Sequence, residues 1–134
     1  MAGTVLDSFA LLAYFRDEEG ADKVQQLLER ASRKGAALLM TEVNYAEVKY
    51  ITLRKQGAEA WRQVQESLTS LPLEFVPVGR ELSDIAADFK SRVSLSLADA
   101  FAAALAKQRK AELVTCDSEF KSLEVEIKIQ WLQK

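Results

Sequence analysis

The segment from Ser96 to Ala106, SLADAFAAALA, constrains the fold of this chain more than any other stretch. It predicts a helix that is apolar on nearly every side, and such a helix has to be covered on all sides. Its first turn nevertheless contains Asp99, and an ionised carboxylate that is removed from water needs a partner. Ser96 and Asp99 also match the capping box S-x-x-D, so this acid is either a helix cap or a functional group.

The absence of histidine excludes several classes of enzyme. With no histidine and the single cysteine Cys116, the chain cannot build a Ser-His-Asp or Cys-His centre, nor a zinc site of His or Cys ligands. Carboxylates and oxygen-bound cations remain as the available chemistry. One cysteine excludes an internal disulfide, and no apolar run reaches the ~18 residues of a membrane span. We therefore expect a single cytoplasmic domain, residues 1–134, with neither a signal peptide nor a membrane segment.

Short apolar runs alternate with helical patterns along the whole sequence. Strands are predicted at residues 4–6, 37–40, 73–76, 113–115 and 124–132. Helices are predicted at residues 9–15, 21–34, 41–56, 58–70, 82–89 and 96–106. This alternation is typical of an α/β fold. We expect a three-layer α/β/α sandwich around a mainly parallel central sheet of about five strands, with the last strand at an edge.

The helix predicted from Thr41 contains a glutamate in an apolar setting. Its inward stripe is predicted to consist of Val43, Ala46, Tyr50 and Leu53. Glu47 falls inside this stripe rather than opposite it. It is either a surface residue that pairs with Arg54 or a functional acid. Asn44 lies one turn earlier, where its side chain could orient the carboxylate of Glu47.

Four acids in apolar surroundings stand at strand ends or early in helices. They are Asp7, Glu47, Asp99 and Asp117. In folds with parallel strands, sites form outside the carboxyl ends of the strands, where these four acids would meet. Each acid alone can be explained as a helix cap or an ion-paired residue. Together they predict a site whose negative charge is neutralised by Mg²⁺ or Mn²⁺, with one or two ions.

The four motifs that carry these acids resemble, in order and spacing, those of a PIN domain. The motifs are VLDSFALLAYF, TEVNYAEVKYI, LSLADAFAAALA and LVTCDSEF. The closest likeness is to the VapC-type ribonuclease toxins of prokaryotic type II toxin–antitoxin pairs, and it covers nearly the whole chain. The resemblance implies a PIN-like fold and a metal-dependent endoribonuclease that hydrolyses RNA phosphodiester bonds and leaves a 5′-phosphate.

The resemblance also implies roles for individual residues. The metal-binding quartet that it implies consists of Asp7, Glu47, Asp99 and Asp117. Thr115 matches a threonine that supports the last acid, and Ser8 and Asn44 match polar positions that support the site. Glu119 falls where some family members carry an additional acid. Homodimerisation and a VapB-type antitoxin that inserts a segment into or across the site are implied as well.

Two other hypotheses stay open. One is a PIN-type nuclease that processes RNA without acting as a toxin, and the other is a non-catalytic binding module whose acids hold a metal ion. The net charge of −2 excludes a broad basic coat for nucleic acid. Four local basic groups are candidate RNA contacts, at residues 30–34, 54–55, 90–92 and 107–110.

Overall fold

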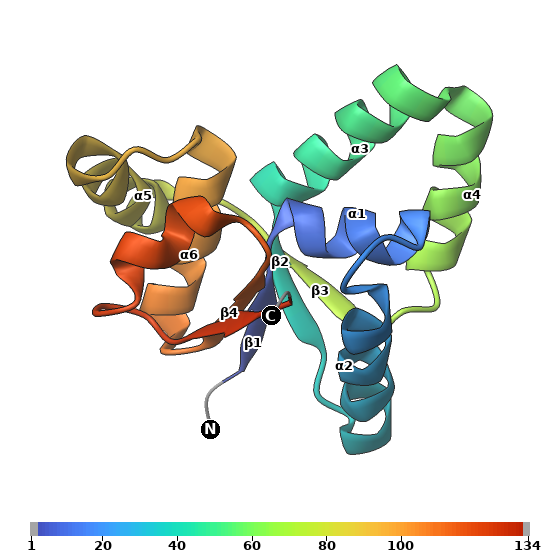
Figure 1. Ribbon diagram of the computed structural model, residues 1–134, viewed down its shortest axis with the longest axis horizontal. Helices are drawn as coiled ribbons and strands as arrows, with labels where there is room; N and C mark the ends of the chain where they lie inside the picture. Colours follow the sequence, from blue (N-terminus) through green and yellow to red (C-terminus); the bar gives the residue numbers. More distant parts are fainter. Residues whose placement is uncertain (1–2, 133–134) are drawn as a thin grey trace.

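A parallel sheet of five strands runs through the centre of the molecule, and helices cover both of its faces (Figure 1). The computed structural model describes residues 3–132. The strands are β1 (Thr4–Leu6), β2 (Leu38–Thr41), β3 (Leu73–Val76), β4 (Glu112–Thr115) and β5 (Ile129–Trp131). The helices are α1 (Ser8–Arg16), α2 (Ala21–Lys34), α3 (Glu42–Gln56), α4 (Ala58–Leu68), α5 (Arg80–Arg92), α6 (Leu97–Arg109) and the 3₁₀ helix η1 (Ser118–Leu123). The predicted three-layer sandwich is confirmed, and the strand pairs are all parallel within the described residues.

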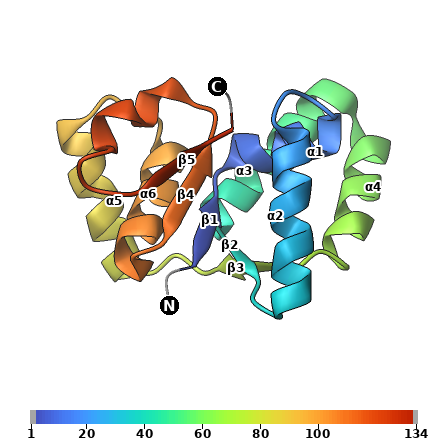
Figure 2. The ribbon, with the colours of Figure 1, turned by 60° about the horizontal axis from the view of Figure 1, so that its bottom comes forward.

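Alternate residues of the strands face two separate cores. In β1, Val5 packs in the core beneath α5 and α6, whereas Leu6 packs in the core beneath α1 and α2. In β4, Leu113 packs in the same core as Val5, and Val114 packs in the same core as Leu6. Figure 2 shows the sheet between these two layers of helices. Because successive side chains of a strand point to opposite faces, a sheet covered on both faces requires strands that are apolar throughout.

The strand order is β3-β2-β1-β4-β5, so β1 lies at the centre of the sheet. The chain first extends from β1 through β2 to β3, and it later returns to the other side of β1 with β4 and β5. The two halves of the sheet meet between β1 and β4. In open α/β sheets, ligand sites form outside the carboxyl ends of the strands at such a point.

Helix α6 lies in one of the two cores, as its apolar sequence predicts. All of its residues from Ala98 to Ala106 are buried, and it contacts α5 and the strands β1, β2 and β4. Most of these residues are alanines, whose small side chains allow close approach of the neighbouring elements. Despite this apolar stretch, no helix within residues 3–132 is both long and apolar enough to cross a membrane.

The predicted inward stripe of α3 is wrong for most of its length. Ala46, Tyr50 and Leu53 are exposed, and only Val43 packs against a core. The buried residues of α3 are Asn44, Val48 and Thr52. Helix α3 contacts α1, α4 and α6, so apolar side chains can pack against a neighbouring helix on more than one of its sides. Its apolar pattern therefore does not determine which side faces inward.

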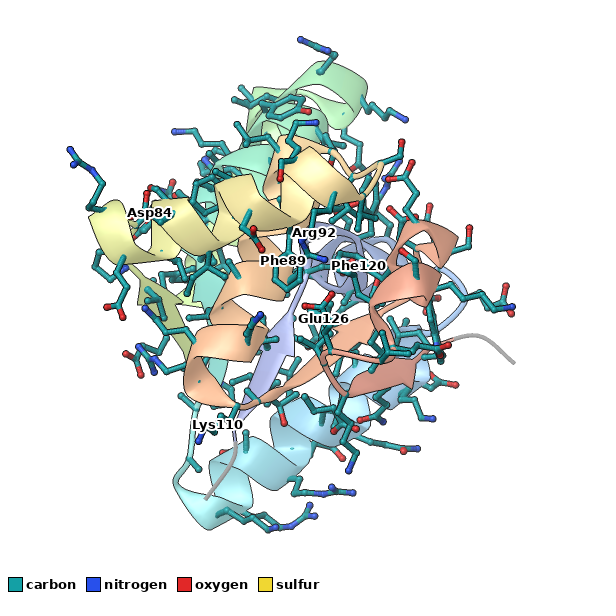
Figure 3. All side chains as sticks on the ribbon, turned by 90° about the vertical axis from the view of Figure 1, so that its left-hand side faces the viewer. Asp84, Phe89, Arg92, Lys110, Phe120 and Glu126 are labelled. Carbon is teal, nitrogen blue, oxygen red and sulfur yellow. The ribbon has the colours of Figure 1, made fainter. Side chains whose placement is uncertain are left out.

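The last strand is shorter than predicted, although it lies at an edge of the sheet as expected. Only Ile129–Trp131 pair with β4, because η1 and a turn take up the preceding residues. The turn is held by Arg92 of α5, whose guanidinium pairs with Glu126 at 3.0 Å and lies 5.5 Å from the ring centre of Phe89 (Figure 3). Val125 is 90% exposed, so the apolar alternation begins before the strand does.

Candidate functional site

Strand ends and helix starts bring acidic side chains to one edge of the sheet. Asp7 follows β1 and Asp117 follows β4, and these two strands are neighbours. Helices α3 and α6, which carry Glu47 and Asp99, begin near the same edge (Figure 1). The four acids are close enough to influence one another electrostatically. The acids predicted from the sequence therefore surround the point where the two halves of the sheet meet.

Asp7 is the N-cap residue of α1 and is fully buried. One of its carboxylate oxygens accepts the N–H of Ala10 at 2.8 Å, and the other accepts the hydroxyl of Thr115. Burial raises the pKa of Asp7 from 3.8 to about 7, and the nearby charges of Asp117 and Glu47 add to this rise. Asp7 is thus a helix cap and, at the same time, a carboxylate held rigidly beside other acids.

Thr115 connects the two acids that follow the central strands. It is the last residue of β4 and is fully buried. Its hydroxyl donates to Asp7 and accepts the N–H of Asp117 at 2.9 Å. A hydroxyl that donates to one group and accepts from another fixes the two relative to each other. The resemblance implied only the support of Asp117, and the contact with Asp7, 108 positions away, comes from the sheet pairing.

Asp99 is 1% exposed, and its Oδ1 has no hydrogen-bond partner among the described residues. The hydroxyl of Ser96 accepts the N–H of Asp99 at 3.1 Å, which is one half of the capping box. The other half does not form, because among the described residues neither carboxylate oxygen of Asp99 accepts the N–H of Ser96. Burial raises the pKa of Asp99 to about 9, together with a hydrogen bond to Asp117 and the negative charges around it. Helix capping therefore does not explain why this carboxylate is buried.

Asp99, Asp117 and Glu119 form a tight group, in which one carboxylate oxygen from each lies within 4.8 Å of the others. Asp117 caps η1, and its Oδ1 accepts the N–H of Glu119 at 2.9 Å. This tight turn brings the exposed Glu119 back towards Asp117. Glu119 was expected only as an additional acid, whereas the structure places it with two members of the quartet. Asp7 and Glu47 lie outside this three-carboxylate group.

Glu47 lies on the side of α3 that faces the other acids. It is half-buried, and its Oε1 is buried without a hydrogen-bond partner in the part of the chain that the structure describes. Its charge contributes to the raised pKa of both Asp7 and Asp99. Arg54 does not pair with Glu47 and lies instead over the ring of Tyr50. The hypothesis of a surface ion pair is therefore wrong for Glu47.

Asn44 has a different role from the one expected, because its side chain does not orient Glu47. Its Nδ2 donates to the hydroxyl of Ser8 at 2.9 Å and to the carbonyl of Ala98 at 3.1 Å. Its Oδ1 accepts the hydroxyl of Thr41. The hydroxyl of Ser8 in turn donates to the backbone carbonyl of Asn44 at 3.3 Å. These buried bonds join the starts of α1, α3 and α6, the three helices next to which the acids lie.

The set of donors fits a divalent cation with oxygen ligands. None of the ion pairs found within residues 3–132 involves an acid of this site, so its negative charges have no protein cation beside them. Two buried carboxylate oxygens, on Glu47 and Asp99, are unpartnered. Hard cations such as Mg²⁺ and Mn²⁺ prefer carboxylate oxygens as ligands. Such a cation would neutralise the negative charge of the site and provide a partner for the two unpartnered oxygens.

Solved structures of toxin–antitoxin proteins share this fold over nearly their whole length. VapBC2 from Rickettsia felis, bound to a DNA fragment from its promoter, has a TM-score of 0.77 at 16% identity, with 95% of this chain and 96% of that chain covered. A toxin–antitoxin complex from Klebsiella pneumoniae has a TM-score of 0.73 at 14% identity, covering 98% and 99%. VapC20 from Mycobacterium tuberculosis, a Sarcin-Ricin loop cleaving toxin, has a TM-score of 0.73 at 16% identity, covering 94% and 99%. At these identities the likeness concerns the fold.

The sequence itself matches one protein family, although no curated protein matches it. The match is to the PIN domain over residues 4–126. This range extends from β1 to the turn after η1, and it includes the four acids of the quartet and Glu119. The chain belongs to the PIN domain family.

Proposed function

We propose that the protein is an endoribonuclease that depends on Mg²⁺ or Mn²⁺ and acts as the toxin of a VapBC-type toxin–antitoxin pair. The observation that carries this proposal is the buried, unpartnered oxygen of Asp99 within a group of acids. A cation would stabilise this oxygen, and no described Lys or Arg does so. Membership of the PIN domain family supports nuclease chemistry at this position.

In the proposed site, one or two ions are held by Asp7, Glu47, Asp99 and Asp117. Glu119 joins them, because its carboxylate lies with those of Asp99 and Asp117. A bound divalent ion supplies charge stabilisation at the scissile phosphate and makes water a stronger nucleophile. The carboxylate oxygens of Asp7 keep free lone pairs beyond the two bonds that they accept, so Asp7 can still act as a ligand.

Protons have to leave these acids before they act as ligands. With a pKa of about 7, Asp7 is half-protonated near neutral pH, and Asp99, with a pKa of about 9, holds its proton. The Thr115 hydroxyl favours the ionised form of Asp7 because it donates to the carboxylate. Metal binding is therefore linked to the release of protons from the site.

The antitoxin partner is proposed from the likeness to known complexes. The Klebsiella pneumoniae structure is a toxin–antitoxin complex, and the Rickettsia felis structure contains VapBC2. VapC20, as a Sarcin-Ricin loop cleaving toxin, supports cleavage of RNA as the activity. By this likeness, the chain is neutralised by a VapB-type antitoxin. That the chain forms a homodimer and acts in the cytoplasm is proposed from the resemblance of its motifs to VapC-type toxins.

Cleavage of total RNA by the purified protein tests the proposed activity. We expect cleavage in Mg²⁺ or Mn²⁺ but not in EDTA, with 5′-phosphates on the products. Asp99→Asn should lower the rate on the order of 100-fold or more, since even outer partners of a metal site contribute 10–100-fold. Asp22→Asn, which removes an acid from the first turn of α2, should keep the wild-type rate. Metal binding without RNA cleavage would contradict the proposal and favour a non-catalytic module.

Expression in a bacterial host separates a toxin from an RNA-processing nuclease. A toxin should arrest growth when expressed alone, and co-expression of the product of a neighbouring gene should restore growth. The Asp99→Asn variant serves as the control that is produced without arrest. Normal growth with active wild-type enzyme would leave the nuclease assignment intact and overturn the toxin role.

A further inference from the structure

We propose that Tyr50 and Arg54 of α3 bind an unpaired nucleotide of the RNA substrate directly beside the acidic site. This inference rests on the proposed function, because it concerns how the same site holds its substrate. It starts from the side of α3 that the sequence pattern placed in the core and that the structure leaves exposed. Tyr50 is 47% exposed, and Arg54 is exposed as well.

Glu47, Tyr50 and Arg54 lie in one row along α3. They are three and four residues apart, so their side chains lie one above another on the surface of the helix. With a rise of 1.5 Å per residue, Tyr50 lies roughly 4.5 Å and Arg54 roughly 10 Å beyond Glu47 along the helix axis. Glu47 is close enough to Asp7 and Asp99 to act on their charges. The row therefore leads outward from the acids.

Arg54 lies against the ring of Tyr50, with 5.4 Å between its guanidinium carbon and the ring centre. In the described part of the chain Arg54 forms no ion pair, so no acid neutralises its charge. An exposed ring beside an uncompensated cation meets the two needs of a single-stranded nucleotide. The ring offers a surface on which a base stacks, and the cation attracts the phosphate.

The other basic groups of the chain do not offer this combination. Because α2 ends just before β2 and α6 just before β4, the groups at residues 30–34 and 107–110 lie at the amino ends of the strands. Lys110 follows the last turn of α6 (Figure 3), at the end of this helix opposite to Asp99. In the third group, Arg92 is engaged in ion pairs and Lys90 donates to a backbone carbonyl. Arg54 is thus the uncompensated cation in the row that starts at the acids.

The charge of the molecule gives such a cation a specific use. The chain has a net charge of −2, and its acids gather where the proposed scissile phosphate has to approach. At physiological ionic strength the Debye length is about 8 Å, so a cation offsets the repulsion only when it lies close by. Arg54, roughly 10 Å along the helix from Glu47, lies just beyond this length, so its attraction acts on a phosphate bound next to it rather than on the acids themselves.

A second copy of the chain is the alternative occupant of this side of α3. Tyr50 and Leu53 are both large exposed apolar side chains, which a partner copy could also cover. The guanidinium of Arg54 favours nucleic acid, because a cation buried between two copies would need an acidic partner. The oligomeric state is therefore measured together with RNA binding.

Fluorescence anisotropy with a labelled single-stranded octamer of adenylate tests the proposal in EDTA, where no cleavage takes place. Tyr50→Ala and Arg54→Gln should each weaken binding on the order of tenfold, since a stacked base contributes that much or more. Tyr50→Phe should bind as the wild type does, because the ring is kept. Lys49→Gln is the matched control: Lys49 lies on the same helix and over an aromatic ring, that of Trp61, but on the side that faces α4.

Three results would overturn the nucleotide contact. The first is unchanged binding by both Tyr50→Ala and Arg54→Gln, and the second is an equal loss of binding by Lys49→Gln. The third is a dimer that Tyr50→Ala converts to a monomer in light scattering, with the affinity for the octamer unchanged. Because the substituted side chains are exposed, the variants should melt close to the wild-type temperature.

The same preparations separate this inference from the proposed function. Cleavage of total RNA in Mn²⁺ is measured for the wild type beside each binding titration. A wild type that cleaves RNA, together with variants that bind the octamer normally, overturns the role of Tyr50 and Arg54 alone. A wild type that neither cleaves RNA nor responds to metal overturns the nuclease function, and the nucleotide contact with it.

Discussion

When no cation is bound, Asp99 holds a proton near neutral pH and Asp7 is half-protonated. Burial raises the pKa of Asp7 to about 7 and that of Asp99 to about 9, against 3.8 for an exposed side chain. Between about pH 4 and pH 9 the folded protein therefore binds protons that the unfolded chain has already released. By linkage, the free energy of unfolding of the metal-free protein falls as the pH rises through this range.

Asp99→Asn should consequently stabilise the metal-free protein at pH 8. The amide keeps the shape of the side chain but has no charge to be buried. The pKa of Asp99 is raised by more than one unit, and one unit corresponds to about 1.4 kcal/mol. The gain in the free energy of unfolding should therefore be about 1 kcal/mol or more. The gain should shrink towards pH 5, which lies closer to the pKa of the unfolded chain. Urea unfolding in EDTA at both pH values measures it, and a gain that does not change with pH would contradict the prediction.

The acids of the site could be predicted because each is an exception to its local pattern. Asp99 stands in an apolar helix, and Asp7 and Asp117 end apolar strands. The partners of Asn44 could not be predicted in the same way, since they lie 36 and 54 positions away in the sequence. The position of Glu119 depends on the tight turn of η1, and the pattern Asp117-Ser118-Glu119, which is consistent with a helix start, does not specify that its carboxylate lies beside that of Asp99.

At the scale of elements, α3 shows that the hydropathy pattern of a helix does not always identify the side that is buried. Its pattern was interpreted as one apolar stripe, but the helix contacts three other helices and has apolar residues on several sides. The hydrogen bonds of Asn44 decide which side of α3 faces inward. In its buried position, the side-chain amide of Asn44 bonds to Ser8, Thr41 and Ala98, so none of its polar atoms is left without a partner. Burial of the alternative, more apolar side would leave that amide without these partners.

A double-mutant cycle between Ser8 and Asn44 tests this account of how the helices are joined. Asn44→Ala should lower the free energy of unfolding by about 1–3 kcal/mol, since it leaves buried partners unsatisfied. Ser8→Ala should cost less once Asn44 is already absent, with a coupling of at least about 0.5 kcal/mol. Ser83→Ala, which removes an exposed hydroxyl at the start of α5, should add independently to Asn44→Ala. Additive effects for Ser8 and Asn44 would mean that their bond does not hold α1 to α3.

At the scale of the whole molecule, a metal bound to the native state alone stabilises the entire fold. The proposed ligands come from the ends of two strands and from two helices, so unfolding any of these elements releases the ion. At 100 times its Kd the ion should add about 2.7 kcal/mol to the free energy of unfolding. For a domain of this size, that is a rise in Tm on the order of 10 °C.

Thermal melts in Mn²⁺ and in EDTA measure this rise. Asp99→Asn should abolish it, Glu119→Gln should reduce it, and Asp22→Asn should leave it unchanged. An equal rise in all four proteins would mean that the ions bind outside the site.

The alternation of strands and helices was sufficient to predict the layers of the fold, but not the order of the strands. Strands β1 and β3 flank β2, and nothing in their sequences states this. Each strand is a short apolar run that would fit any interior position of a covered sheet. Side-chain packing and the lengths of the connecting helices select the order, and both become known only with the three-dimensional structure.

The central position of β1 also bears on how the protein is made. Its neighbour β4 begins at Glu112, and the bond between Asp7 and Thr115 spans 108 positions. During synthesis from the N-terminus, one edge of β1 stays unpaired and the acids lack Asp117 until β4 and the residues after it have been translated. A fragment that ends before Glu112 lacks both β4 and Asp117, so the nuclease proposed here should become active only after this part of the chain has joined β1.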